Sequence, residues 1–296
     1  MRDPRFLSRH GIKVNVPMAD YTRIGTGGNA DFFVAAGTAK ELTSVLDGAR
    51  DNSLKTVVIG SGSQTVCSDH GWRGLVVKNE IRYCDLDFNR TQVMVGGGLP
   101  MADLVNRLAE EGYGGFEPLV AYGGSVGGAI RSNLRWGTTT IARHLVTVSL
   151  YSGGRVVEVA PGDLQFGPNE SRLLRTGETV LGATFLVSEK DPEQIRRRLL
   201  EATRDRLRDD PAGTAAVRVF LDPPDGESAA EVVGRLNLAG TESGQAVVSK
   251  KNPNMIINRG GARSADAYKL AQRLKHDATM KLGVKLREAV SWMGEW

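Results

Sequence analysis

The first third of the chain alternates strand and helix patterns, which constrains the fold more than any other feature of the sequence. Strand patterns cover residues 29–36, 54–60, 74–79 and 91–98, and helix patterns cover 38–52 and 99–115. The first helix pattern begins at Thr38, a residue type that caps helix N-termini, and continues with apolar residues at helical spacing. Strands that alternate with helices are typical of α/β domains, so we expect an α/β arrangement here.

A glycine-rich middle segment separates this region from the rest of the chain. Further strand patterns follow at 144–152, 154–160, 179–188, 216–221, 245–249 and 254–258, and a helix pattern covers 264–283. Residues 191–193 read Asp-Pro-Glu, which places a cap and a first-turn proline before one long charged helix over 191–208. Residues 208–216 then predict a linker.

Charge and composition exclude several classes of protein. The 38 basic and 34 acidic residues give a net charge of +4, which is too small and too scattered to predict a nucleic-acid partner. No run approaches the roughly 18 apolar residues of a membrane span, and the N-terminus lacks the apolar region of a secretion signal. Cys67 and Cys84 form no metal-ligand cluster with the four histidines, and unpaired thiols fit a reducing cytosol. We therefore expect a cytoplasmic protein without a metal site.

A glycine-serine loop follows the buried strand pattern at 57–59. Glycines allow backbone N–H groups to turn inward, and serine hydroxyls add donors, so Gly60, Ser61, Gly62 and Ser63 resemble a phosphate cradle. The common phosphate motifs do not fit, because the loop lacks the P-loop lysine and does not open a helix. Taken alone, the loop is compatible with an anion site or with a simple tight turn.

Four segments together carry a family resemblance: 21–34, 57–77, 114–137 and 244–270. In this order they resemble UDP-N-acetylenolpyruvoylglucosamine reductase (MurB), which has the FAD-binding fold of vanillyl-alcohol oxidase, called PCMH-type. The most specific part is GSVGGA at 124–129, followed by Asn133. The resemblance implies an α+β fold in three parts. These are two α/β subdomains of a PCMH-type FAD-binding domain, residues 1–75 and 76–210, and a MurB-like C-terminal substrate domain, residues 211–296.

The resemblance also implies FAD as the cofactor. The loop is then assigned to the pyrophosphate through Gly60, Ser61, Gly62, Ser63 and Gln64. The residues assigned to the flavin and its linker are Gly124, Ser125, Gly128, Ala129 and Asn133, with Tyr21 and Ile141 as looser contacts. Relatives that attach FAD covalently carry a histidine in the loop, where this chain has Ser63-Gln64, so we expect non-covalent FAD. Cys67 is expected to be a small buried residue rather than an attachment point.

Three motif positions that carry chemistry in this family hold other residues here. Asn169, in FGPNES, stands in the place of an arginine. Arg218, in VRVFLDP, stands in the place of a serine that donates a proton, and arginine does not give up its proton at working pH. Ala289, in LREAV, replaces a glutamate, and Glu288 lies one residue away, where a strand turns its side chain to the opposite face. A histidine that is usual in the family is Asn252 here.

The motifs assigned to FAD are retained, whereas the positions that carry the family's chemistry hold other residues. This combination favours a protein that still binds FAD but catalyses a different reaction. We expect an FAD-dependent oxidoreductase that transfers hydride between flavin N5 and a small substrate, anionic or of nucleotide-sugar type, in a specialised biosynthetic pathway. NADPH is the candidate electron donor. The candidate catalytic residues are Arg218, Asn169 and Glu288, and the candidate substrate contacts are Arg218, Asp222, Lys250, Lys251 and Asn254.

Two alternatives stay open at this point. One is a working UDP-N-acetylmuramate dehydrogenase of peptidoglycan synthesis that uses NADPH, with Arg172, Ser171 or Glu288 as substitutes. The other is a flavin-binding protein without catalysis. The sequence leaves the substrate, the direction of hydride transfer and the oligomeric state open.

Overall fold

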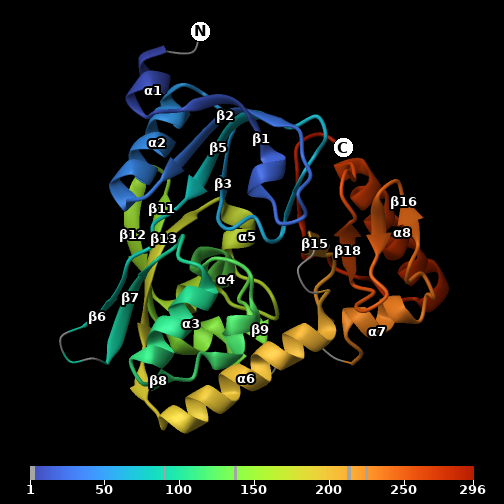
Figure 1. Ribbon diagram of the computed structural model, residues 1–296. Helices are drawn as coiled ribbons and strands as arrows, with labels where there is room; N and C mark the ends of the chain where they lie inside the picture. Colours follow the sequence, from blue (N-terminus) through green and yellow to red (C-terminus); the bar gives the residue numbers. More distant parts are fainter. Residues whose placement is uncertain (1–3, 88, 90, 137–138, 212–214, 224–225) are drawn as a thin grey trace. The chain divides into compact units, whose positions relative to one another are not determined.

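The computed structural model describes residues 4–87, 89, 91–136, 139–211, 215–223 and 226–296 (Figure 1). The chain divides into two compact units, and each is assembled from separate stretches. The first unit comprises Met1–Lys13, Phe33–Ser61 and Leu75–Arg206, and the second comprises Val14–Phe32, Gly62–Gly74 and Leu207–Trp296. The division into 1–75, 76–210 and 211–296 stays a prediction.

The N-terminal sheet has four strands in the order β1-β2-β5-β3. These strands are β1 (Lys13–Pro17), β2 (Asn29–Ala36), β5 (Trp72–Asn79) and β3 (Thr56–Ile59). β3 and β5 pair in parallel, and α2 (Ala39–Asp51) connects β2 to β3 along the chain. Thr38 caps α2 as expected, because its hydroxyl accepts the Glu41 N–H at 3.1 Å and the Glu41 carboxylate accepts the Thr38 N–H.

The first unit contains a five-stranded antiparallel sheet in the order β12-β11-β13-β7-β6. Its strands are β12 (Arg155–Val159), β11 (Leu145–Ser152), β13 (Thr179–Leu186), β7 (Gln92–Gly96) and β6 (Cys84–Leu86). Helices α3 (Met101–Glu110) and α4 (Val126–Arg131) contribute Leu104 and Ile130 to a core that also contains Val95 and Phe185. This core holds the glycine-rich segment 122–129 in place.

The long charged helix is α6 (Pro192–Asp209), as the Asp-Pro-Glu signal predicts. The Asp191 carboxylate accepts the Glu193 N–H at 3.2 Å, and the Asp191 carbonyl accepts the Ile195 N–H. The last residues of α6, from Leu207 onward, belong to the second unit.

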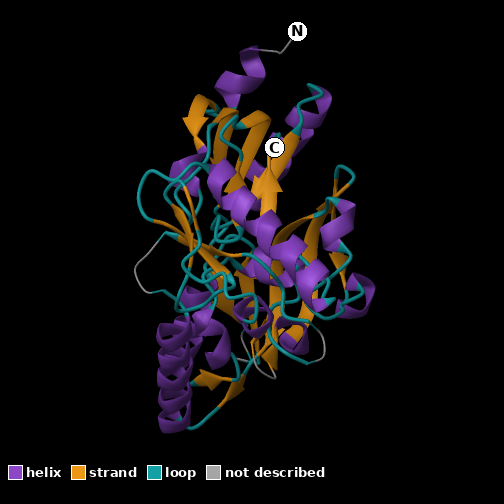
Figure 2. Ribbon diagram, turned by 90° about the vertical axis from the view of Figure 1, so that its right-hand side faces the viewer, coloured by secondary structure: helices purple, strands orange, loops and turns teal. Residues whose placement is uncertain are grey.

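The second unit contains an antiparallel sheet in the order β15-β18-β17-β16. Its strands are β15 (Ala216–Arg218), β18 (Met255–Asn258), β17 (Ala246–Val248) and β16 (Glu242–Ser243). Helix α8 (Ser264–Leu282) lies against this sheet (Figure 2), and Leu270 and Leu274 pack with Val217 and Ile256 in the core. In the same unit, β4 (Thr65–Cys67) pairs in parallel with β19 (Ser291–Met293).

Shorter elements complete the description. They are α1 (Pro4–Arg9), α5 (Leu173–Thr176), α7 (Ala229–Gly234), β8 (Tyr113–Gly114), β9 (Arg135–Trp136), β10 (Thr139–Thr140), β14 (Ser188–Glu189) and the 3-10 turns Met18–Tyr21, Glu117–Ala121, Ile141–His144 and Pro161–Leu164. Among the described residues, none of the helices is both long and apolar enough to span a membrane.

Candidate functional site

The predicted pyrophosphate loop leaves β3 at Gly60 and turns sharply at Gly62. Gly62 has φ +65°, a conformation that glycine adopts without penalty. A Cβ atom at this position would lie 1.9 Å from the Tyr21 carbonyl oxygen, and the Gly62 carbonyl accepts the Arg23 N–H at 3.0 Å. The structure therefore brings together Tyr21 and Gly62, both predicted cofactor contacts, and only glycine fits at residue 62.

The backbone donors of this loop are available to a ligand. In the described part of the chain, none of the N–H groups of Ser61, Gly62, Ser63 and Gln64 donates a hydrogen bond to a protein acceptor. Gly62 is itself buried. Buried N–H groups are almost always paired, so the unpaired N–H of Gly62 would suit an anion bound at the loop.

In the first unit, the loop meets the second predicted cofactor segment at Gly60. A Cβ atom on Gly60 would lie 2.2 Å from the Ser125 hydroxyl oxygen. Ser125 caps helix α4, where its hydroxyl accepts the Gly128 N–H at 3.3 Å. Gly60, Ser125 and Gly128 are therefore neighbours, as their shared assignment to the cofactor requires.

The glycine-rich segment is anchored by a second glycine run, at 96–98. The Gly127 N–H donates to the Gly97 carbonyl at 2.8 Å, and the Gly124 carbonyl accepts the Met101 N–H at 2.9 Å. Ala129 and Ile141 are fully buried. These contacts fix the backbone of residues 124–129 within the first unit.

Asn133 offers a buried acceptor next to the predicted catalytic turn. Its side-chain N–H₂ donates to the Gly167 carbonyl at 2.8 Å, whereas its Oδ1 atom is buried without a partner among the described residues. Gly167 begins the turn that carries Asn169, which has φ +53°. The structure thus places the Asn133 side chain against the turn that carries Asn169.

These features fit FAD. In the second unit, Gly62 to Gln64 have backbone donors that would suit a pyrophosphate, and Gly62 has no room for a side chain; in the first unit, the same holds for Gly60, whose Cβ would meet Ser125. The free acceptor of Asn133 fits a donor such as the isoalloxazine N3–H or a ribityl hydroxyl. Cys67 is fully buried, as expected, and burial raises the pKa of its thiol to about 12.

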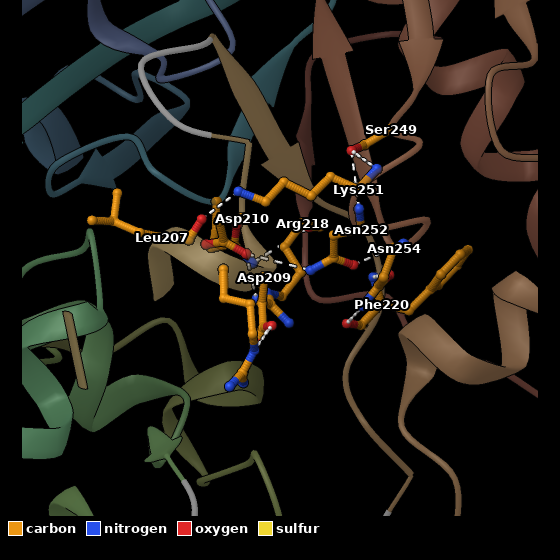
Figure 3. A network of polar contacts seen from close by, with 11 residues as sticks. Leu207, Asp209, Asp210, Arg218, Phe220, Ser249, Lys251, Asn252 and Asn254 are labelled. Carbon is orange, nitrogen blue, oxygen red and sulfur yellow. Dashed lines mark hydrogen bonds and ion pairs between the residues drawn. The ribbon is translucent and has the colours of Figure 1, made fainter. Parts of the chain in front are cut away.

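Arg218 lies in β15 within a polar network of the second unit (Figure 3). Its Nη2 atom pairs with Asp210 Oδ1 at 3.1 Å, and its carbonyl lies 3.5 Å from the Gln64 side-chain nitrogen. The same Asp210 oxygen accepts a hydrogen bond from Asn252 Nδ2 at 3.3 Å. The predicted cofactor contact Gln64 and the predicted catalytic residue Arg218 are therefore in contact.

The other predicted substrate contacts make protein contacts of their own. Asn254 is fully buried, and its side-chain amide accepts the Phe220 N–H at 2.9 Å and donates to the Phe220 carbonyl at 2.8 Å. Asp222 accepts the Ala229 N–H at 2.9 Å, and Lys251 donates to the Leu207 carbonyl. Lys250 is exposed. Their roles toward a substrate stay predictions.

Glu288 is bound by three donors of the second unit. Its carboxylate accepts hydrogen bonds from Lys275 Nζ at 2.7 Å, Trp292 Nε1 at 2.9 Å and Gln272 Nε2 at 3.3 Å. Burial alone would raise the pKa of Glu288, but the hydrogen bond and charge of Lys275, with the other two donors, lower it below its ordinary value. Residues 219–221 pair with this segment, since the Ala289 N–H donates to the Val219 carbonyl.

Asp210 is the residue of this network that the sequence did not reveal. It lies within the predicted linker, and an Asp-Asp-Pro sequence carries no signal for a site. Its importance depends on contacts with residues 218 and 252, which are distant in the sequence.

Known proteins match both parts of the chain. Residues 30–158 match a family model described as an FAD binding domain, and residues 210–293 match one described as UDP-N-acetylenolpyruvoylglucosamine reductase, C-terminal domain. The reductase of Geobacter metallireducens is 31% identical over 280 residues, covering 94% of this chain and 93% of the relative. That of Carboxydothermus hydrogenoformans is 30% identical, with 95% and 93% covered. The crystal structure of the reductase (MurB) from Thermus caldophilus is similar, with a TM-score of 0.82 and 28% identity, covering 96% of this chain and all of the other.

Fold and comparisons together define an FAD-dependent oxidoreductase with a PCMH-type FAD-binding domain and a MurB-like C-terminal domain. The chain belongs to the UDP-N-acetylenolpyruvoylglucosamine reductase (MurB) family. The predicted family, the α+β fold class and the cofactor FAD are thereby confirmed. The individual site residues stay predictions.

Proposed function

We propose that this protein is a MurB-type FAD-dependent oxidoreductase with an altered active site, which acts on a small substrate that carries an oxyanion. FAD, when bound, supplies the hydride chemistry, with NADPH as the proposed electron donor. The chain's own residues bind the cofactor, orient the substrate and stabilise its charge. A specialised cytoplasmic biosynthetic role belongs to the same proposal.

The ion pair of Arg218 carries this proposal. A guanidinium keeps its proton throughout the working pH range, so Arg218 does not replace a serine as a proton donor. It offers fixed positive charge and several N–H donors instead, which suit a carboxylate or a phosphate. The partly buried carboxylate of Asp210 holds it at 3.1 Å.

The other altered positions support the same reading. Asn169 provides no permanent charge to stabilise an enolate, and Ala289 provides no carboxylate. Glu288 is adjacent in sequence, but its carboxylate is already bound by Lys275 and Trp292. Glu288 is therefore a poor replacement for the carboxylate that Ala289 lacks.

A second candidate is reduction of UDP-N-acetylenolpyruvoylglucosamine itself. The relatives that share about 30% identity over nearly the whole chain are named for that substrate. On this reading, residues other than those of the family motifs supply the proton and stabilise the charge.

Anaerobic mixing separates the two candidates. The FAD-loaded protein is reduced with NADPH and then mixed with UDP-N-acetylenolpyruvoylglucosamine, with the Thermus caldophilus reductase as a parallel control. We expect reoxidation by this substrate to be at least about 100-fold slower than in the control, because one general acid contributes roughly 10²–10⁴ in rate. Reoxidation at a rate comparable with the control would refute an altered reaction and establish the second candidate.

A further inference from the structure

One carboxylate oxygen joins two residues that are distant in the sequence. Asp210 Oδ1 accepts hydrogen bonds from Arg218 Nη2 at 3.1 Å and from Asn252 Nδ2 at 3.3 Å (Figure 3). The Asp210 side chain is only 13% exposed. A charge-assisted contact at this degree of burial holds its partners more firmly than a surface ion pair does.

Asn252 forms hydrogen bonds through its backbone N–H and through both atoms of its side-chain amide. It is 5% exposed, and its Oδ1 atom accepts the Asn254 N–H at 3.1 Å, so its Nδ2 atom must point the other way, toward Asp210. Its backbone N–H donates to the Ser249 hydroxyl at 3.1 Å. The Asp210 carboxylate therefore binds a side chain whose two amide atoms are both hydrogen-bonded.

The chain just before Asp210 is also anchored. Lys251 donates to the Leu207 carbonyl in the last turn of α6. Arg208 pairs with Asp209 at 2.7 Å and, with the charges of Arg218 and Lys251, lowers the pKa of Asp209. Arg208, Arg218 and Lys251 carry three positive charges, and Asp209 and Asp210 carry two negative charges. The net charge of these five residues is therefore positive.

The Arg218 guanidinium is thus held through one nitrogen atom, Nη2. Among the described residues, Asp210 alone accepts a hydrogen bond from this side chain, and Asp209 interacts with its charge, so the Nε and Nη1 atoms donate no hydrogen bond there. The Arg218 side chain is 30% exposed, so part of it is accessible to a ligand. A fixed guanidinium with free donors can bind an oxyanion without losing further rotational freedom.

We infer that Asp210 is a positioning residue, which together with Asn252 orients Arg218 to bind an oxyanion, a carboxylate or a phosphate, of the substrate. The inference rests on the proposed function, whose substrate class it makes more specific. Asp210 acts through Arg218 and does not itself contact the ligand.

The motif departures expected from the sequence involve the same two residues. Arg218 and Asn252 both stand where the family motifs have other residues, and both bind the same oxygen of Asp210. Their shared partner supports the proposal that Arg218, Asn252 and Asp210 act as a unit.

Oxyanion affinity in a set of variants tests the inference. The probes are sodium phosphate and sodium acetate, titrated calorimetrically into the FAD-loaded protein at constant ionic strength. The variants are Asp210→Ala, Asp210→Asn, Arg218→Gln and the double variant Asp210→Ala/Arg218→Gln. Asp210→Ala and Asp210→Asn remove the same charge, but asparagine keeps an oxygen that can accept both hydrogen bonds. Their comparison therefore separates positioning from charge.

We expect wild type to bind at least one probe, and Arg218→Gln to abolish this binding. Asp210→Ala should weaken it about 3- to 10-fold, the value of one immobilised side chain, and Asp210→Asn should restore it to within about threefold of wild type. In the Arg218→Gln background, Asp210→Ala should have no further effect. Binding of acetate alone indicates a carboxylate, and binding of phosphate indicates a phosphate.

Three results would overturn the inference: no binding of either probe by wild type, equal affinities in the two Asp210 variants, or an additive double variant. Flavin content and reduction by NADPH are measured on the same samples. Failure of flavin reduction would count against the proposed function and leave the affinity comparison intact.

Discussion

Replacement of Gly62 by alanine tests whether this residue shapes the FAD loop. Gly62 has φ +65°, and a Cβ atom there would lie 1.9 Å from the Tyr21 carbonyl oxygen. Since Cβ atoms essentially never approach other heavy atoms within 3.0 Å, the Tyr21 backbone or the loop must move by more than about 1 Å. Gly62→Ala therefore combines backbone strain with a displacement of the loop.

Gly261 provides a matched control in the same unit. It has φ +81°, but an added Cβ atom would meet nothing within 4 Å. Gly261→Ala should cost only the backbone term, about 1–2 kcal/mol of stability. Gly62→Ala should cost this amount and, in addition, at least one loop contact to the pyrophosphate, which is worth about 1.5–3 kcal/mol for a charged acceptor. Loss of that contact would lower the FAD affinity roughly 10- to 100-fold.

Quenching of FAD fluorescence measures the affinity, and thermal unfolding of the apoprotein measures stability. We expect both variants to lose stability but only Gly62→Ala to lose FAD affinity. Equal FAD affinity in the two variants would show that the loop tolerates the displacement, and the assignment of Gly62 to the cofactor would then be wrong.

Three further predictions concern the cofactor and the second unit. Acid precipitation should release all the flavin as free FAD, because the loop lacks a histidine for covalent attachment; flavin in the pellet would contradict this. Gly60→Ala should lower FAD affinity through the 2.2 Å contact with the Ser125 hydroxyl, and Ser125→Ala in the same chain should recover part of the loss, since only Cβ at 3.1 Å remains. If the effects of Gly60→Ala and Ser125→Ala on FAD affinity are additive, the predicted contact between the two residues is disproved. The pKa of Glu288 is lowered in the folded protein, so its ionised form stabilises the fold above the unfolded pKa, near 4.5, and this contribution disappears as pH falls through the folded pKa. Glu288→Gln should therefore unfold at a lower temperature than wild type at pH 7, with a difference that narrows below pH 4.5; a pH-independent difference would contradict the assignment.

Local signals in the sequence predicted the elements that depend on local chemistry. The cap at Thr38 and the Asp-Pro-Glu start at 191–193 marked the beginnings of α2 and α6 correctly. The glycine pattern at 124–129 was specific because close backbone contacts, such as Gly127 to Gly97, admit no side chain. Such constraints act within a few residues or depend on residue size, so they are visible in the sequence.

Contacts between distant segments could not be predicted in this way. The parallel pairing of β4 with β19 joins residues 65–67 to 291–293, and neither strand carries a signal for the other. Asp210 appeared as part of a linker because its two partners follow it by 8 and 42 residues. Polar networks of this kind depend on tertiary packing, which the order of residues does not encode locally.

Measurements of stability and of oxyanion affinity distinguish two cases. In a rebuilt site, Arg218 binds an oxyanion of the substrate; in a decayed site, Arg218 has no role toward a ligand. A partly buried arginine is unfavourable unless it is paired, so a passenger arginine at residue 218 would also retain its Asp210 partner for the sake of folding. In a passenger pair, loss of Asp210 lowers stability and leaves oxyanion affinity unchanged. In a rebuilt site, the same loss lowers affinity through Arg218 alone. The Arg218 side chain stays partly exposed in the ion pair, so the oxyanion affinities of the Asp210 and Arg218 variants, compared with their stabilities, decide between the two cases.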